Sequence, residues 1–174
     1  MSKFWNDKIK EIEPYTPGEQ PKDKKYIKLN TNENPYPPSA KVIEKIKTME
    51  LENLKLYPDP DVMELGKVIA EYFSNKMNDK ITRKQVFIGN GSDEVLAFIF
   101  MTFFNAGDKV YYPDITYSFY PVYADLFNVK EVKISLNDSF EIEIQKYFGL
   151  DGHIIIANPN APTSIALKLD EIEE

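Results

Sequence analysis

Short apolar runs alternate with stretches of helical periodicity over the second half of the sequence. A short apolar run bounded by polar or glycine positions predicts a strand, whereas apolar residues spaced three and four apart predict a helix. The predicted strands are residues 86–88, 109–112, 129–135 and 153–157, and the predicted helices between them are residues 93–104 and 117–127. This alternation is typical of a layered α/β sheet with crossover helices.

The first part of the chain has a different pattern. Residues 1–38 are rich in proline and lysine, and the prolines exclude a continuous helix or a central strand, so we expect an extended arm. Ser39 is placed to cap a short amphipathic helix that follows the arm. Residues 62–73 then carry apolar side chains on one helical face, and Asp61 with Glu64 has capping-box spacing, which predicts the start of a second helix.

The composition of the chain excludes several kinds of partner and active site. The 174 residues include 21 Lys and Arg against 28 Asp and Glu, a net charge of −7, which argues against nucleic acid or an anionic membrane surface as the main partner. The chain has no cysteine and a single histidine, which excludes a disulfide framework, a thiolate zinc site and a catalytic thiol, and disfavours Ser/His/Asp hydrolysis. The charged N-terminus and the lack of a long apolar run predict a cytoplasmic protein.

The strongest local signal lies at residues 89–94, Gly-Asn-Gly-Ser-Asp-Glu, between a predicted strand and a predicted buried helix. Glycines permit a tight turn, and the first N–H groups of a helix form a site for an anion such as phosphate. The hydroxyl of Ser92 would face the same ligand. The carboxylates of Asp93 and Glu94 stabilise the first turn of the helix, and they can point away from the anion. A plain turn with Ser92 as the helix N-cap is the alternative.

Two further segments follow predicted strands. Residues 111–120 are rich in tyrosine and phenylalanine, and a ring at the carboxyl end of a parallel strand is placed to stack on a flat ligand. Residues 158–163, Asn-Pro-Asn-Ala-Pro-Thr, predict a rigid polar loop whose amides can bond a ligand hydroxyl. Core packing of the rings and a simple Asn-Pro turn are the alternatives.

Taken together and in this order, these segments resemble the class I and II aminotransferases that use pyridoxal 5′-phosphate, most closely the histidinol-phosphate aminotransferases. The resemblance covers the whole chain, but only about the first half of a full-length family member. It implies an incomplete α/β fold of fold-type I, with a mixed, mostly parallel sheet and helices on both faces. Residues 1–60 would form an arm and short helices with substrate and dimer contacts, and residues 61–174 the first part of the large domain that binds the cofactor. The matching stretches are residues 14–18, 29–35, 56–59, 89–94, 116–120 and 158–163.

The resemblance also implies roles for individual residues. Ser92, Asp93 and Glu94 would hold the phosphate of pyridoxal 5′-phosphate, mainly through backbone N–H groups. Tyr117 would stack on the pyridine ring of the cofactor. Tyr57 would reach across the interface of a homodimer to the phosphate of the cofactor in the second subunit.

Further roles concern the substrate pocket and the polar loop. Tyr15 and Asn32 would line the pocket for the small-molecule substrates. In the family, the asparagine directly before the loop proline bonds the ring hydroxyl of the cofactor, whereas this sequence has Ala161 there, and Ser164 in place of the family's glycine. Asn160, one residue earlier, is the candidate to substitute for the missing asparagine.

The implied activity is amino transfer between histidinol phosphate and 2-oxoglutarate in histidine biosynthesis. The family's Schiff-base lysine, its carboxylate at the pyridine nitrogen and its substrate-binding arginines follow the polar loop, beyond this sequence, so we assign no catalytic residue and no metal. We expect the 174-residue chain alone to be inactive, poorly stable or completed by another chain. An amino-acid-phosphate decarboxylase on the same scaffold, and a non-catalytic module for a phosphorylated ligand or a protein partner, are the alternatives.

Overall fold

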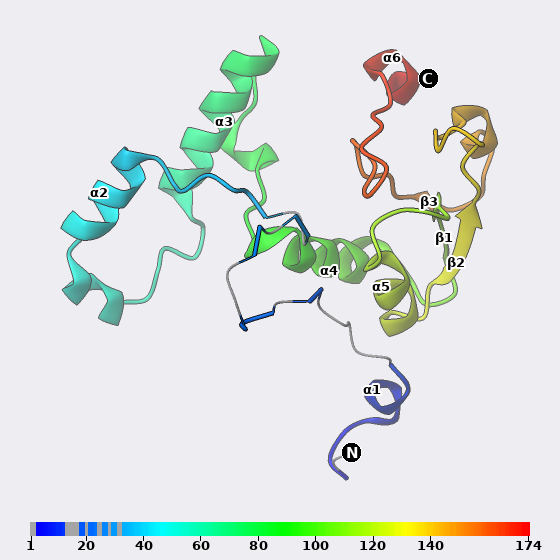
Figure 1. The fold of residues 1–174 in the computed structure, drawn as a ribbon, viewed down its shortest axis with the longest axis horizontal. Helices are drawn as coiled ribbons and strands as arrows, with labels where there is room; N and C mark the ends of the chain where they lie inside the picture. The colour runs from blue at the N-terminus through cyan, green and yellow to red at the C-terminus, as the bar shows by residue number, and fades with distance from the viewer. Residues whose placement is uncertain (1–2, 13–17, 20, 24–25, 28, 31–32) are drawn as a thin grey trace. The chain divides into compact units, whose positions relative to one another are not determined.

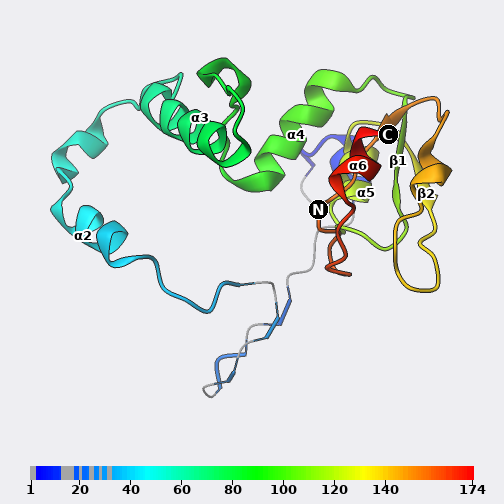
Figure 2. The same ribbon diagram turned by 90° about the horizontal axis from the view of Figure 1, so that it is seen from above.

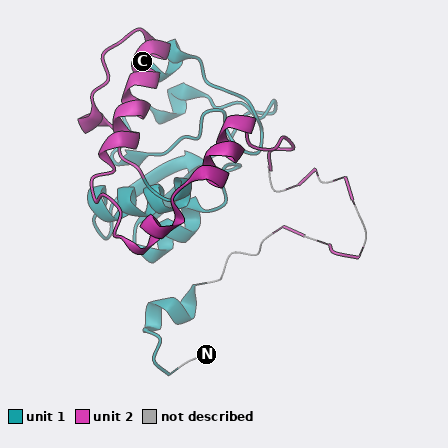
Figure 3. Ribbon diagram, turned by 90° about the vertical axis from the view of Figure 1, so that its left-hand side faces the viewer, with its two compact units in different colours: residues 1–14, 89–174 teal, residues 15–88 magenta. Residues whose placement is uncertain are grey.

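The computed structural model describes residues 3–12, 18–19, 21–23, 26–27, 29–30 and 33–174. They form two compact units, which are coloured separately in Figure 3: Met1–Pro14 with Gly89–Glu174, and Tyr15–Ile88. The predicted division at residue 60 stays a prediction. Tyr15 and Asn32, the two residues predicted to line a substrate pocket, lie outside the described residues.

In the unit Tyr15–Ile88, the regular elements among the described residues are all helices, and they begin at Ala40 (Figure 1). The predicted cap of the first helix is confirmed, because the Ser39 hydroxyl accepts a hydrogen bond from the Val42 N–H at 3.4 Å. The elements of this unit are α2 (Ala40–Thr48), the 3₁₀ helix η1 (Leu51–Lys55), α3 (Met63–Met77) and the 3₁₀ helix η2 (Arg83–Gln85).

The start of α3 differs from the prediction. The N-cap residue is Val62, which makes no side-chain capping bond. Asp59 rather than Asp61 supplies the carboxylate, whose two oxygens accept hydrogen bonds from Met63 N at 2.8 Å and from Asp61 N at 3.0 Å. Val62, with φ of 46°, forms the turn between them. These two backbone hydrogen bonds, with a smaller contribution from the charge of Arg83, hold the pKa of the Asp59 carboxyl below its ordinary value.

The second unit is built on a parallel sheet, as the sequence predicts. Its three strands lie in the order β2-β1-β3, and β1 and β2 run side by side in Figures 1 and 2. In the register, Tyr111 of β1 pairs with Val132 on one side and Ile154 on the other. The elements of this unit are α1 (Asp7–Glu11), α4 (Gly91–Phe103), β1 (Lys109–Pro113), α5 (Tyr120–Leu126), β2 (Lys130–Ile134), η3 (Ile144–Tyr147), β3 (His153–Ile154) and α6 (Leu169–Glu173).

Two predicted strands and the predicted arm need correction. Residues 86–88 are not part of the sheet, because no strand pairs with them among the described residues. The strand predicted at 153–157 is shorter, although Ile155 N still donates to Tyr111 O at 2.9 Å. The extended arm contains the short helix α1, which begins there because the Asn6 side chain accepts from the Ile9 N–H at 2.8 Å.

Both predicted helices of the second unit begin at different residues. The chain turns at Gly91, whose φ of 84° lies in the region that favours glycine, so α4 starts there and Ser92 belongs to its first turn instead of capping it. The residue at the cap position, Asn90, makes no side-chain capping bond. Helix α5 begins only at Tyr120, because Pro121 occupies the first turn, where proline is favoured.

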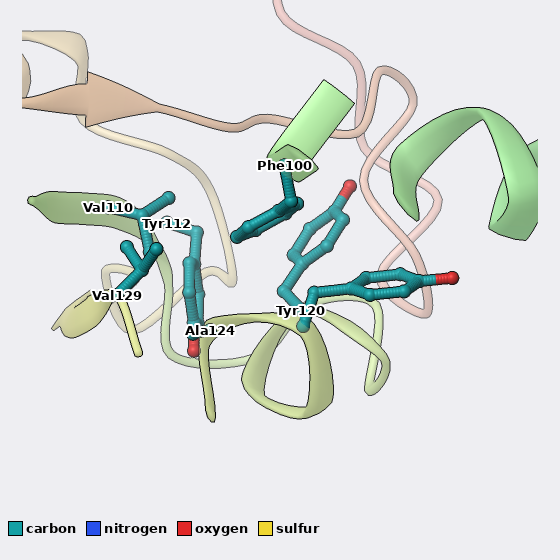
Figure 4. Packing of buried hydrophobic residues seen from close by; sticks show 7 residues of the cluster. Phe100, Val110, Tyr112, Tyr120, Ala124 and Val129 are labelled. Carbon is teal, nitrogen blue, oxygen red and sulfur yellow. The ribbon is translucent and has the colours of Figure 1, made fainter. Parts of the chain in front are cut away.

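The core of this unit lies between β1 and the two helices α4 and α5 (Figure 4). Side chains alternate along a strand, so Val110 and Tyr112 face this core while Tyr111 faces the opposite side of the sheet. On that side, Ile144 and Tyr147 of η3 are also buried. The core cluster consists of Phe100, Val110, Tyr112, Tyr120, Tyr123, Ala124 and Val129.

Candidate functional site

The first turn of α4 offers backbone N–H groups for an anion. In a helix of 13 residues starting at Gly91, the N–H groups of Ser92 and Asp93 have no carbonyl within the helix to bond. The helix dipole adds partial positive charge at this end, and the exposed hydroxyl of Ser92 lies beside these N–H groups. The turn therefore has the donors that a phosphate group needs.

The acidic side chains of this turn have hydrogen-bond donors within the protein. The Glu94 carboxylate accepts from Asn90 N at 2.6 Å, and the Asp93 carboxylate accepts from the Tyr117 hydroxyl at 2.6 Å. Gly89 makes the first of these arrangements possible, because a Cβ there would lie 2.8 Å from Cγ2 of Val95 and 3.1 Å from the Glu94 carboxylate. The tight glycine turn thus brings the Glu94 side chain back over the loop.

Tyr117 places an aromatic ring beside this turn. Its ring packs edge-on against the buried ring of Tyr120, with 5.6 Å between ring centroids, and it is partly exposed. A cavity of about 360 Å³ adjoins the ring, and Lys133 supplies the one cationic side chain among its lining residues. No residue of α4 lines this cavity, and the hydrogen bond from Tyr117 to Asp93 is what places the ring beside the turn, after the carboxyl end of β1. A ring beside a helix N-terminus suits a flat ligand that carries a phosphate.

Asn160 is buried and hydrogen-bonded within the protein. It is 2% exposed, and its Nδ2 donates to Ile115 O at 2.9 Å and to the Thr163 hydroxyl at 3.3 Å. Its Oδ1 accepts from the Thr116 hydroxyl at 2.8 Å. Both amide hydrogens are used within the protein, so Asn160 ties the polar loop to the segment after β1. That it substitutes for the cofactor-binding asparagine absent at Ala161 stays a prediction.

The structure therefore brings together Ser92, Asp93, Glu94 and Tyr117, all in one compact unit. Tyr57 belongs to the unit Tyr15–Ile88, where its side chain is fully exposed. Among the described residues, no group of three His, Asp or Glu side chains is placed to hold a metal ion. Within the same described ranges, none of the helices has the length and apolar character needed to cross a bilayer.

Sequence reasoning missed one residue that contacts this site. The hydroxyl of Tyr123 donates a hydrogen bond to the main-chain oxygen of Asp93 at 2.6 Å. Burial and the negative charge of Asp93 raise the pKa of this hydroxyl, so it remains a donor. The only signal in the sequence was the helical spacing of Tyr120 and Tyr123, and that spacing is equally typical of core packing.

Comparison with known proteins gives consistent matches. The profile of the family "Aminotransferase class I and II" matches residues 24–174. The histidinol-phosphate aminotransferase of Brachyspira hyodysenteriae is 59% identical over 174 residues, which cover 100% of this chain and 48% of that protein. The histidinol-phosphate aminotransferase of Clostridium acetobutylicum is 55% identical over 174 residues, with the same coverage of 100% and 48%.

A structural comparison agrees with these matches at the level of the fold. The crystal structure of aspartate aminotransferase from Thermotoga maritima superposes with a TM-score of 0.73 and 24% identity, covering 84% of this chain and 41% of that one. The chain spans about half the length of the curated relatives it matches, 48% in the two cases given above.

Proposed function

This chain belongs to the class I and II aminotransferase family, and we propose that it supplies part of an active site that binds pyridoxal 5′-phosphate. The proposed reaction transfers an amino group between histidinol phosphate and 2-oxoglutarate, in histidine biosynthesis. The observation that carries the proposal is the hydrogen bond of 2.6 Å between the Tyr117 hydroxyl and Asp93, because it joins an aromatic ring to a phosphate-binding turn. The substrates are inferred from relatives of 59% and 55% identity that bear this name.

The residues present fit the phosphate and the ring of that cofactor. The N–H groups of Ser92 and Asp93, together with the Ser92 hydroxyl, would hold the phosphate at the positive end of α4. The Tyr117 ring would stack on the pyridine ring, and its bond to Asp93 would hold it in one orientation. When bound, the cofactor supplies an electron sink for the amino-acid substrate.

The task of this chain in the reaction is to bind and to orient. A phosphate fixed at α4 and a ring fixed by Tyr117 leave the cofactor little freedom to rotate, so its reactive group is presented in one direction. Tyr57, whose side chain is fully exposed, would contact the phosphate of the cofactor in a second copy, which makes a homodimer part of the proposal. We also take the protein to be cytoplasmic, as the sequence predicts.

A chimera tests this function. Residues 1–174 would be joined to the remaining length of the Brachyspira hyodysenteriae relative, whose 59% identity over this region makes a matched fold the expected result. We expect the chimera to bind pyridoxal 5′-phosphate and to transfer the amino group of histidinol phosphate to 2-oxoglutarate, and the 174-residue chain alone to show no turnover.

Two variants of the chimera make the test specific. Tyr117→Ala should weaken cofactor binding by roughly tenfold, because a stacked aromatic ring contributes about 1 kcal/mol or more. Phe148→Ala is the matched control, because Phe148 is an exposed aromatic residue directly after η3, and it should leave cofactor binding unchanged. A folded chimera that binds no cofactor would refute the proposal, and one that releases carbon dioxide from an amino-acid phosphate would identify the decarboxylase instead.

A further inference from the structure

Asp93 receives hydrogen bonds from two tyrosine hydroxyls of the segment that contains α5. The Tyr117 hydroxyl donates to the Asp93 carboxylate at 2.6 Å, and the Tyr123 hydroxyl donates to the main-chain oxygen of the same residue, also at 2.6 Å. The function proposed above uses Tyr117 but gives no role to Tyr123. The second hydrogen bond therefore needs an explanation of its own.

Tyr123 is held rigidly in the core. It is 5% exposed, and its ring packs against Phe100 of α4 at 5.5 Å and against Phe119 at 5.1 Å between centroids. A buried hydroxyl without a partner is costly, so its one bond to Asp93 is strongly favoured in the folded protein. The ring and the hydroxyl together fix Tyr123 to α4 at two points.

The accepting oxygen lies in the turn that would bind phosphate. A donor on the Asp93 carbonyl oxygen holds the first turn of α4 in place, and this turn carries the N–H groups of Ser92 and Asp93. Tyr117 and Tyr123 belong to the same short segment, so both bonds set the position of the aromatic ring relative to the turn. A donor set held in place before the ligand arrives binds with a smaller loss of conformational entropy.

We propose that Tyr123 is a positioning residue for the phosphate site, acting through the main chain of Asp93. This inference rests on the proposed function, because it takes the first turn of α4 to be the phosphate site. Tyr123 would not touch the ligand, but it would hold in place the N–H groups of Ser92 and Asp93 that bind the phosphate.

The test replaces the hydroxyl and keeps the ring. Tyr123→Phe removes the bond to Asp93, and Tyr112→Phe is the matched control, because Tyr112 is also buried in the same core and its hydroxyl bonds Glu131 of β2 instead. Binding of inorganic phosphate would be followed by NMR at the amide signals of Ser92 and Asp93 in the chimera without cofactor, and the chimera that carries residues 1–174 unchanged is the unaltered chain of the comparison. We expect Tyr123→Phe to raise the dissociation constant about fivefold and Tyr112→Phe to change it by less than about twofold.

The outcomes separate this inference from the proposed function. Phosphate that shifts the Ser92 and Asp93 signals equally well in Tyr123→Phe and in the unaltered chain overturns the positioning role and leaves the phosphate site standing. Phosphate that shifts neither signal in the unaltered chain overturns the phosphate site, and the positioning role with it.

A second measurement needs no variant and decides the case where Tyr123→Phe does not fold. The hydroxyl proton of a buried tyrosine exchanges slowly enough to be observed by NMR when it is hydrogen-bonded. In the unaltered chain we expect the Tyr123 hydroxyl signal to shift when phosphate is added. A hydroxyl signal that stays constant while the Ser92 and Asp93 amides respond would overturn the inference.

Discussion

Gly66 provides a sharp test of how the unit Tyr15–Ile88 is held together. This glycine is buried within α3, and a Cβ added to it would fall inside the Arg83 side chain, 2.6 Å from Cζ. The guanidinium of Arg83 donates to Val86 O at 2.6 Å and to Asp61 O, so it joins the two ends of the segment that contains α3. We predict that Gly66→Ala displaces Arg83 and breaks both bonds.

The expected magnitude follows from these contacts. Hydrogen bonds from a charged group are worth about 1.5 to 3 kcal/mol each, so losing both costs about 3 to 6 kcal/mol. Alanine is favoured over glycine in a helix by about 1 kcal/mol, which offsets part of this loss. The free energy of unfolding of this unit should therefore fall by about 2 to 5 kcal/mol, as measured by urea unfolding with hydrogen exchange at the amides of α3.

Arg83→Ala supplies the control, because it empties the space that the new Cβ would occupy. In the Arg83→Ala background, Gly66→Ala should reverse its sign and stabilise the unit by about 1 kcal/mol, the helix preference alone. An equal destabilisation by Gly66→Ala in both backgrounds would refute the reasoning, since Arg83 would then have no part in the effect.

Three further predictions concern the caps and the polar loop. In the chimera, Ala161→Asn should tighten pyridoxal 5′-phosphate binding by roughly tenfold in an absorbance titration, because it restores one hydrogen bond to the cofactor. Asn160→Ala should lower the free energy of unfolding of the chain by about 1 to 3 kcal/mol in urea, because it leaves the loop groups unpaired. The pKa of Asp59 is lowered in the folded state, so its contribution to stability is present above the unfolded pKa and is lost as the pH falls through the folded pKa. Asp59→Asn should therefore flatten the acid side of the stability profile measured by thermal unfolding, and an unchanged profile would contradict this.

The sheet could be predicted from the sequence because its signals are local. Residues 110–112 of β1 form a continuous apolar run, and β2 carries Val132 and Ile134 between charged residues. The parallel arrangement follows from the helix between the two strands. The tight turn at residues 89–94 could be predicted for the same reason, because its two glycines directly precede the apolar helix in the sequence.

Most of the features that were missed depend on contacts between residues that are distant in sequence. The hydrogen bonds of Asn160 to Ile115 and Thr116 could not be predicted, because these partners are remote in sequence and no local pattern reveals them. The start of α3 is the exception, because its bonds are local, but spacing alone does not distinguish a capping box at Asp61 from the turn in which the Asp59 carboxylate bonds Met63 N. Residues 86–88 have the composition of a strand, but a strand also needs a neighbour, and none pairs with it in the described part of the chain.

The most direct test of the account compares two ligands that differ only in the phosphate. Pyridoxamine 5′-phosphate and pyridoxamine, neither of which carries an aldehyde that reacts with lysines, would be titrated into the isotopically labelled chimera without cofactor. The account predicts that the phosphorylated ligand shifts the amide signals of Ser92 and Asp93 together with the ring signals of Tyr117, and that pyridoxamine leaves both amides unchanged. Equal responses to the two ligands, or responses confined to other residues, would contradict it.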